Sequence, residues 1–248
     1  ALILLLLIFI GQVFAHDTVS DNGDGISKDV TLQITELQNG VYQHTSYKTV
    51  TGFGKVDSHG LVVVIEKRAY IIDTPWSDAD TQALLNWIEK KGLEPELSLS
   101  THSHEDRTAG IRLLNSLSVP TYTSKLTDML LRKDNKTPAT NTFDAEFFNL
   151  LPEHIEVFYP GPGHAEDNLV VWLPKHKLLF GGCFVRSMGW NSLGNTEDAD
   201  IGLWDDSVNN VLSRYSNIKT LVPGHGKVGD EHMLQHTLNL VRKAQMEP

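Results

Sequence analysis

Cysteine is nearly absent from this chain, since Cys183 is the only one among its 248 residues, and no intramolecular disulfide can therefore form. Basic residues are also in the minority, with 21 lysines and arginines against 31 aspartates and glutamates and a formal net charge of −10. No basic stripe with interleaved aromatic residues is visible in the sequence. Nucleic acid is therefore not an expected partner.

Long apolar runs are scarce as well. Leu2 to Ile10 is uninterrupted and apolar but too short to span a bilayer as a finished helix, and the small residues around Val13 to Ala15 suit a signal peptidase. We predict a secretory signal peptide over residues 1–15, a flexible leader over 16–29 and one domain over 30–248; a buried N-terminal helix is the alternative to the signal. No cysteine follows the apolar run to carry a lipid. We therefore expect a periplasmic monomer without stable membrane association once the signal is removed.

The composition, 40% hydrophobic and 21% charged, fits one domain with one substantial core. An exported protein usually carries its cysteines in pairs, so the unpaired thiol of Cys183 is an oxidation liability unless something occupies it. A metal ion would do so.

Hydrophobic patterning predicts strands followed by amphipathic helices in both halves of the chain. A hairpin is predicted over Thr45 to Lys55, with Phe53 between two glycines at its tip. The succession of strands and helices in both halves favours two sheets packed together with helices outside. Strands are predicted near residues 30–37, 41–42, 61–65, 70–72, 97–99, 155–159, 169–173, 178–180 and 220–222, and helices near 78–92, 111–117, 126–131, 204–215 and the C-terminus.

The most informative motif is Thr101-His102-Ser103-His104-Glu105-Asp106. In an extended stretch, at about 3.3 Å per residue, alternate side chains share a face, so His102, His104 and Asp106 could close on one metal ion or on two adjacent ions. Three ligands leave coordination open for water, as in catalytic metal sites. Taken alone, the motif also fits a polar loop with solvated histidines.

Three later segments have the same sequence pattern, in which a predicted strand is followed by small residues and then by a possible metal ligand. They are Gly161-Pro162-Gly163-His164, Phe180-Gly181-Gly182-Cys183 and Val222-Pro223-Gly224-His225. Glycine lets the backbone turn sharply, which suits a ligand presented from a loop. The chain thus offers six candidate metal ligands, a set that chance explains poorly: His102, His104, Asp106, His164, Cys183 and His225.

With these motifs, the chain resembles the metallo-β-lactamase superfamily from about Val41 to His225. Most hydrolases of that superfamily place a histidine after the aspartate of His-x-His-x-Asp and an aspartate where this chain has Cys183. Here Arg107 follows Asp106, and the combination is similar to the first subclass of class B β-lactamases. The resemblance implies a four-layer αββα sandwich of two mixed sheets with helices on the outer faces.

The resemblance further implies two zinc ions, one held by three histidines and one by an aspartate, a cysteine and a histidine. It implies hydrolysis of the amide bond of penicillins, cephalosporins and carbapenems by zinc-bound hydroxide, with antibiotic resistance as the result. Asp106 would orient the hydroxide. Asp73 matches a position whose carboxylate fixes the orientation of the ligands, although without the resemblance it could equally cap the next turn. The first set would be His102, His104 and His164, and the second Asp106, Cys183 and His225.

Three positions bear on substrate binding. Arg186 stands where the family often has a lysine that holds the substrate carboxylate, and a guanidinium keeps that charge. Asn195 matches an asparagine that polarises the lactam carbonyl, and Phe53 matches an aromatic residue on a mobile flap. Each could otherwise be an ordinary loop residue.

Two other functions stay open at this point. Another hydrolase of the superfamily could act on thioesters, lactones or phosphodiesters, although Cys183 and Arg107 weigh against it. A periplasmic zinc-buffering protein without turnover would need ligands that fill the coordination shell, whereas two three-ligand sets leave room for substrate. The sequence has no Gly-x-Ser-x-Gly motif that would indicate a serine nucleophile.

Overall fold

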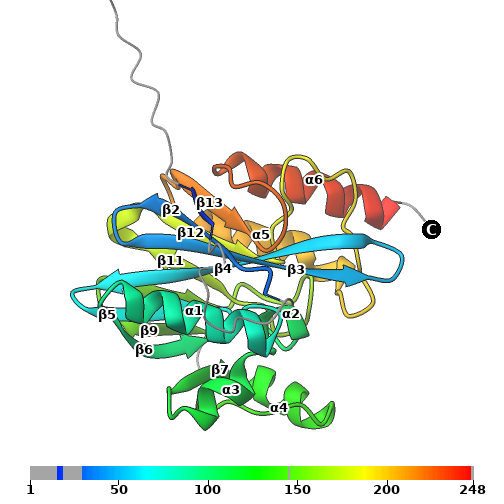
Figure 1. Ribbon diagram of the computed structural model, residues 1–248. Helices are drawn as coiled ribbons and strands as arrows, with labels where there is room; N and C mark the ends of the chain where they lie inside the picture. The colour runs from blue at the N-terminus through cyan, green and yellow to red at the C-terminus, as the bar shows by residue number, and fades with distance from the viewer. Residues whose placement is uncertain (1–15, 19–29, 145, 247–248) are drawn as a thin grey trace, which may run out of the picture.

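The computed structural model describes residues 16–18, 30–144 and 146–246. The predicted signal peptide and most of the predicted leader lie outside this part. In the described part the strands form two sheets, and the element order is shown in Figure 1. None of the described helices combines the length and the apolarity needed to cross a membrane.

The first sheet has eight strands, in the spatial order β1 (His16–Thr18), β2 (Gln33–Gln38), β3 (Val41–Val50), β4 (Gly54–Ile65), β5 (Arg68–Ile72), β6 (Glu94–Leu99), β7 (Thr121–Ser124) and β8 (Asn141–Phe143). The second has five, in the order β13 (Thr220–Pro223), β12 (Leu178–Gly182), β11 (Val170–Leu173), β10 (Ile155–Phe158) and β9 (Phe147–Leu151). The helices are α1 (Asp78–Lys90), α2 (Glu105–Thr108), α3 (Ile111–Ser116), α4 (Lys125–Lys133), the short 3₁₀ helix η1 (Pro174–His176), α5 (Ile201–Arg214) and α6 (His232–Met246).

Both sheets are mixed. Strands β1 to β5 pair antiparallel, whereas β5 to β8 pair parallel. In the second sheet β12 and β13 are parallel and the other pairs antiparallel. The carboxyl ends of parallel neighbours meet at one edge of a sheet, so the loops that leave β5 and β6, and those that leave β12 and β13, come together in pairs.

Side-chain alternation along the strands builds the layers. Leu61 and Ile72 face the second sheet and join a core with Val171 and Phe180 of that sheet. Their neighbours in β4 and β5 face the other way, toward α1. The outer face of the second sheet is covered by α5 and α6, and Figure 1 shows these helices and α1 on opposite sides of the strands. The predicted αββα sandwich is thus confirmed.

Helix α1 illustrates why the hydrophobic pattern predicted some elements correctly. The Ser77 side chain accepts a hydrogen bond of 3.0 Å from the Asp80 N–H, which caps the helix. Leu84, Trp87 and Ile88 are buried on one face. The patterning did not predict β7, β8 and β9, because the first two are short and polar and the third has no apolar alternation.

Candidate metal centre

Four chain segments at one edge of the sandwich carry the six candidate ligands, and one of these ligands, Asp106, lies in the short helix α2. The loop after β6 brings His102 and His104, and His164 lies between β10 and β11. Cys183 directly follows β12, and His225 directly follows Gly224 at the end of β13. All six predicted ligands are therefore brought to one place.

The His-x-His-x-Asp motif is not the continuous extended stretch that its alternation predicted. The chain enters helix α2 at Glu105, where the Arg107 N–H donates to the His104 carbonyl at 3.0 Å. The Thr108 hydroxyl donates to the same carbonyl at 2.9 Å. Asp106 lies in this helical turn, and its carboxylate faces Cys183 and His225 while remaining within 4.8 Å of the ligand atom of His102.

The three histidines of the first set point ring nitrogens at one another. His104 Nδ1 lies 3.1 Å from His102 Nε2 and 3.2 Å from His164 Nε2. A tetrahedral zinc ion, with Zn–N bonds of about 2.0 to 2.1 Å, holds its ligand nitrogens about 3.3 Å apart. Both distances from His104 Nδ1 are close to the spacing that such an ion needs, and all three ligand nitrogens lie within 4.8 Å of one another.

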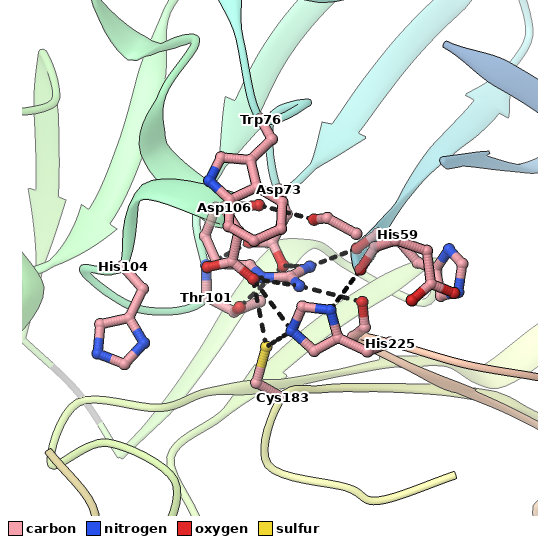
Figure 2. Close-up of polar contacts among 12 residues, drawn as sticks. His59, Asp73, Trp76, Thr101, His104, Asp106, Cys183 and His225 are labelled. Carbon is pink, nitrogen blue, oxygen red and sulfur yellow. Dashed lines mark hydrogen bonds and ion pairs between the residues drawn. The ribbon is translucent and has the colours of Figure 1, made fainter. Parts of the chain in front are cut away.

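The second set is formed by Asp106, Cys183 and His225, which Figure 2 shows converging. Cys183 Sγ lies 3.2 Å from His225 Nε2 and 3.6 Å from Asp106 Oδ2, and Nε2 lies 3.3 Å from that oxygen. One thiolate, one imidazole and one carboxylate make a donor set suited to zinc. His102 also lies within 4.8 Å of the Asp106 and Cys183 ligand atoms, so the two sets are adjacent.

Burial keeps two histidines of the first ligand set neutral. It lowers the pKa of His102 and of His164 well below the usual value, and the neighbouring ring of His104 adds to this effect. Both rings are therefore neutral near pH 7, as metal ligands must be. Burial alone would also lower the pKa of His225, but the Cys183 and Asp106 side chains reverse this and raise it to about 10.

Arg107 is the fully buried partner of Asp106. Its Nε and Nη2 donate to Asp106 Oδ2 at 3.0 and 2.7 Å, and Nη2 also donates to the Gly224 carbonyl at 3.1 Å. Burial would raise the pKa of Asp106, but this guanidinium lowers it well below the usual value. The sequence showed only that Arg107 stands where most hydrolases of the superfamily have a histidine. It did not show that the Arg107 side chain is buried.

Asp73 is fully buried and contacts Thr101 and Arg107, which adjoin residues of the two sets. Its carboxylate accepts the Thr101 N–H at 2.7 Å, the Thr101 hydroxyl at 2.9 Å and Arg107 Nη1 at 3.3 Å. Burial raises the pKa of Asp73 to about 6 although Arg107 lowers it. Through these bonds Asp73 reaches the neighbours of two ligands, His102 and Asp106.

Two further residues hold ligands and were not predicted. Asp198 Oδ2 lies 3.0 Å from His104 Nε2, on the side of the ring away from the other histidines. The Asp57 backbone carbonyl accepts from His225 Nδ1, and its carboxylate accepts the Gly226 N–H at 3.0 Å. Neither stands in a recognisable motif, so only the folded chain reveals them.

A cavity of about 270 Å³ opens over the two ligand sets. The three predicted substrate residues all line it, together with His104, Asp106, His164 and His225. Phe53, at the tip of the β3–β4 hairpin, is 53% exposed, and Asn195 is exposed. Arg186 is buried, with its guanidinium 4.8 Å from the centre of the Trp190 ring.

Comparison with known proteins places this centre in a family. The model of the metallo-β-lactamase superfamily matches residues 54–225. A metallo-β-lactamase type 2 of Pseudomonas aeruginosa is 46% identical over 206 residues, which are 83% of this chain and 82% of that protein. One of Bacillus cereus is 38% identical over 217 residues, which are 86% of this chain and 83% of that protein.

Solved structures of metallo-β-lactamases also superimpose on this chain. The DIM-1 metallo-β-lactamase exposed to ceftazidime superimposes with a TM-score of 0.86 and 50% identity, covering 88% of this chain and all 100% of its own. The FIM-1 metallo-β-lactamase of Pseudomonas aeruginosa in its mono-zinc form gives a TM-score of 0.83 and 32% identity, covering 90% of this chain and 100% of its own. The fold, the two ligand sets and these matches together show that this chain is a hydrolytic enzyme of the metallo-β-lactamase superfamily.

Proposed function

We propose that this enzyme hydrolyses the amide bond of β-lactams with the help of two zinc ions. The observation that carries the proposal is the pair of adjacent three-ligand sets beneath one cavity. Neither set fills a coordination shell of four, which leaves room for water and substrate and argues against zinc buffering. The names of the relatives support β-lactams as the substrate class.

His102, His104 and His164 would hold one zinc ion, and Asp106, Cys183 and His225 the other. Bound zinc supplies Lewis acidity and lowers the pKa of a bound water to about 7, so that hydroxide is available near neutrality. The neutral imidazoles of the first set leave the charge of their ion undiminished. The Cys183 thiolate, a soft and strong donor, suits the second.

The remaining residues would bind and orient the reactants. Asp106 lines the cavity and can accept a hydrogen bond from the attacking water. The Asn195 Oδ1 atom accepts the Glu197 N–H at 3.1 Å, which leaves the Nδ2 group as the donor that Asn195 can offer to a substrate. In that arrangement Asn195 would donate to the lactam carbonyl and stabilise the oxygen as it becomes negative.

Arg186 would bind the carboxylate that β-lactams carry beside the ring. Among the residues that the structure describes, its buried Nε has no hydrogen-bond partner. A carboxylate at this end of the cavity would satisfy that donor and pair with the charge. Phe53, on the opposite hairpin, would cover the apolar part of the substrate.

We further propose that penicillins, cephalosporins and carbapenems are all substrates, which would confer antibiotic resistance. The apolar run from Leu2 to Ile10 supports export to the periplasm, where we expect the protein to act as a monomer.

The test is hydrolysis of a cephalosporin, a carbapenem and a thioester by the protein without residues 1–15, with zinc and after chelation. We expect turnover of both lactams that chelation abolishes and zinc restores. Thioester turnover without lactam turnover would identify another hydrolase of the superfamily, and zinc binding without any turnover would identify a zinc-binding protein.

A further inference from the structure

His44 on strand β3 is a buried histidine outside both ligand sets. Its side chain is 1% exposed, and its Nε2 lies 3.0 Å from the backbone carbonyl of Asp73. A carbonyl only accepts, so Nε2 must carry the proton and donate. Among the described residues, the other ring nitrogen has no hydrogen-bond partner.

An unpaired buried nitrogen is destabilising, and an apolar side chain of similar size would avoid it. The fold nevertheless makes room for this ring. Gly60 pairs with His44 across β3 and β4, and a Cβ atom on Gly60 would collide with the ring and with the Ile72 carbonyl. The hydrogen bond from the His44 ring to the Asp73 carbonyl is therefore the feature that explains its presence.

The acceptor of that bond is a strained residue. Asp73 has a φ of 59°, in the left-handed region that side chains other than glycine adopt at a cost. Its N–H donates to the Leu99 carbonyl at 2.7 Å, and its carbonyl faces His44. These two bonds hold the peptide groups on either side of the strained residue.

The orientation of Asp73 matters because its carboxylate contacts residues that adjoin both ligand sets. It holds Thr101, which directly precedes His102, through two bonds of 2.7 and 2.9 Å. It also accepts from Arg107, whose other nitrogens donate to Asp106. A rotation of the Asp73 backbone would move both contacts at once.

We propose that His44 is a positioning residue of the metal centre, which acts by fixing the strained Asp73 backbone and, through Thr101 and Arg107, the ligands His102 and Asp106. The inference rests on the proposed zinc sites. The His44 ring donates to the Asp73 carbonyl and belongs to neither ligand set, so its effect would pass through Asp73.

The test compares His44→Leu and His44→Gln in the zinc-loaded enzyme. Leucine removes the donor, whereas the amide nitrogen of glutamine can occupy the place of Nε2. We expect His44→Leu to weaken zinc binding about 10-fold or more and to lower kcat with little change in KM. In the cobalt-substituted protein its thiolate-to-metal absorption should shift, and His44→Gln should restore all three properties.

A matched control separates positioning from stability. Val62, buried in β4 on the face toward α1, belongs to the same sheet, where it pairs with Tyr42 of β3 and Ile71 of β5. Val62→Ala should lower the melting temperature with zinc affinity and absorption unchanged. Unchanged zinc affinity in His44→Leu, or an equal loss in Val62→Ala, would overturn the inference. Absence of zinc binding by the wild-type protein would instead overturn the proposed function.

Discussion

His104 and Asp198, 94 positions apart in the chain, lie with Nε2 and a carboxylate oxygen 3.0 Å apart. The other ring nitrogen, Nδ1, faces His102 and His164. A carboxylate only accepts, so it fixes the proton on Nε2 and leaves the lone pair of Nδ1 directed at the metal position. This contact selects the tautomer that can bind zinc.

Asp198→Ala should therefore weaken zinc binding by the three-histidine set. We expect a loss of about 10-fold, the lower end of the range for such supporting carboxylates. The Asp198 side chain is 64% exposed, so the melting temperature of the metal-free protein should change little. Competition with a chromophoric chelator measures the affinity. Glu197→Ala, the same loss of charge at the next residue, is the control, and an equal effect there would show that general charge rather than the His104 contact is responsible.

The candidate ligands were easier to identify in the sequence than the residues that surround them. Each ligand stands in a short motif beside glycine or another ligand, and residue type and spacing carry that information. The partner Asp198 lies in the acidic stretch Glu197 to Asp200, where nothing distinguishes it from its neighbours. The extended geometry predicted for His102 to Asp106 was wrong because alternation of residue types is also compatible with a loop that enters a helix.

The strands, like the ligands, could be predicted only where a local sequence pattern reveals them. Strands such as β4 and β5 were predicted because their apolar runs are buried by both the other sheet and α1. Strand β7 (Thr121–Ser124) depends instead on parallel pairing with β6 and β8, which sequence does not display. Long-range pairing and burial, the two properties missed at Arg107 and β7, arise only when distant segments meet.

Cys183→Ser should reduce bound zinc from two ions to one. A serine hydroxyl is a much weaker zinc ligand than a thiolate, whereas the first set consists of three imidazoles and does not include this sulfur. We expect turnover to fall with the loss of the second ion. Metal analysis after dialysis, together with kinetics, measures both effects. Unchanged stoichiometry would contradict the assignment of Cys183 to the second set.

Arg186→Ala should raise KM for a cephalosporin with a smaller effect on kcat. A charge-assisted hydrogen bond contributes about 1.5 to 3 kcal/mol, so KM should rise at least 10-fold. Arg186→Lys should recover part of the affinity, because the charge remains but stacking on Trp190 is lost.

Lys136 provides the control for this variant. It lines the same cavity, but its Nζ is bonded to the Ser103 carbonyl at 3.3 Å and to Asp134 at 3.0 Å. Lys136→Ala should therefore change KM less than Arg186→Ala does. The reverse order would assign substrate binding to Lys136 instead.

His44 should make the protein sensitive to acid. Burial lowers the pKa of His44 from 6.5 to about 3, so the folded state keeps the ring neutral while the unfolded chain takes up a proton below about pH 6.5. The group therefore contributes stability that is present above pH 6.5 and is lost as the pH falls toward 3. At pH 5 the expected loss is about 2 kcal/mol. The free energy of unfolding of the metal-free wild type and of His44→Gln, measured by urea denaturation at pH 7 and pH 5, tests this. The wild type should lose about 2 kcal/mol more than the variant between these two values, and an equal loss in both would show that His44 is not held neutral in the folded protein.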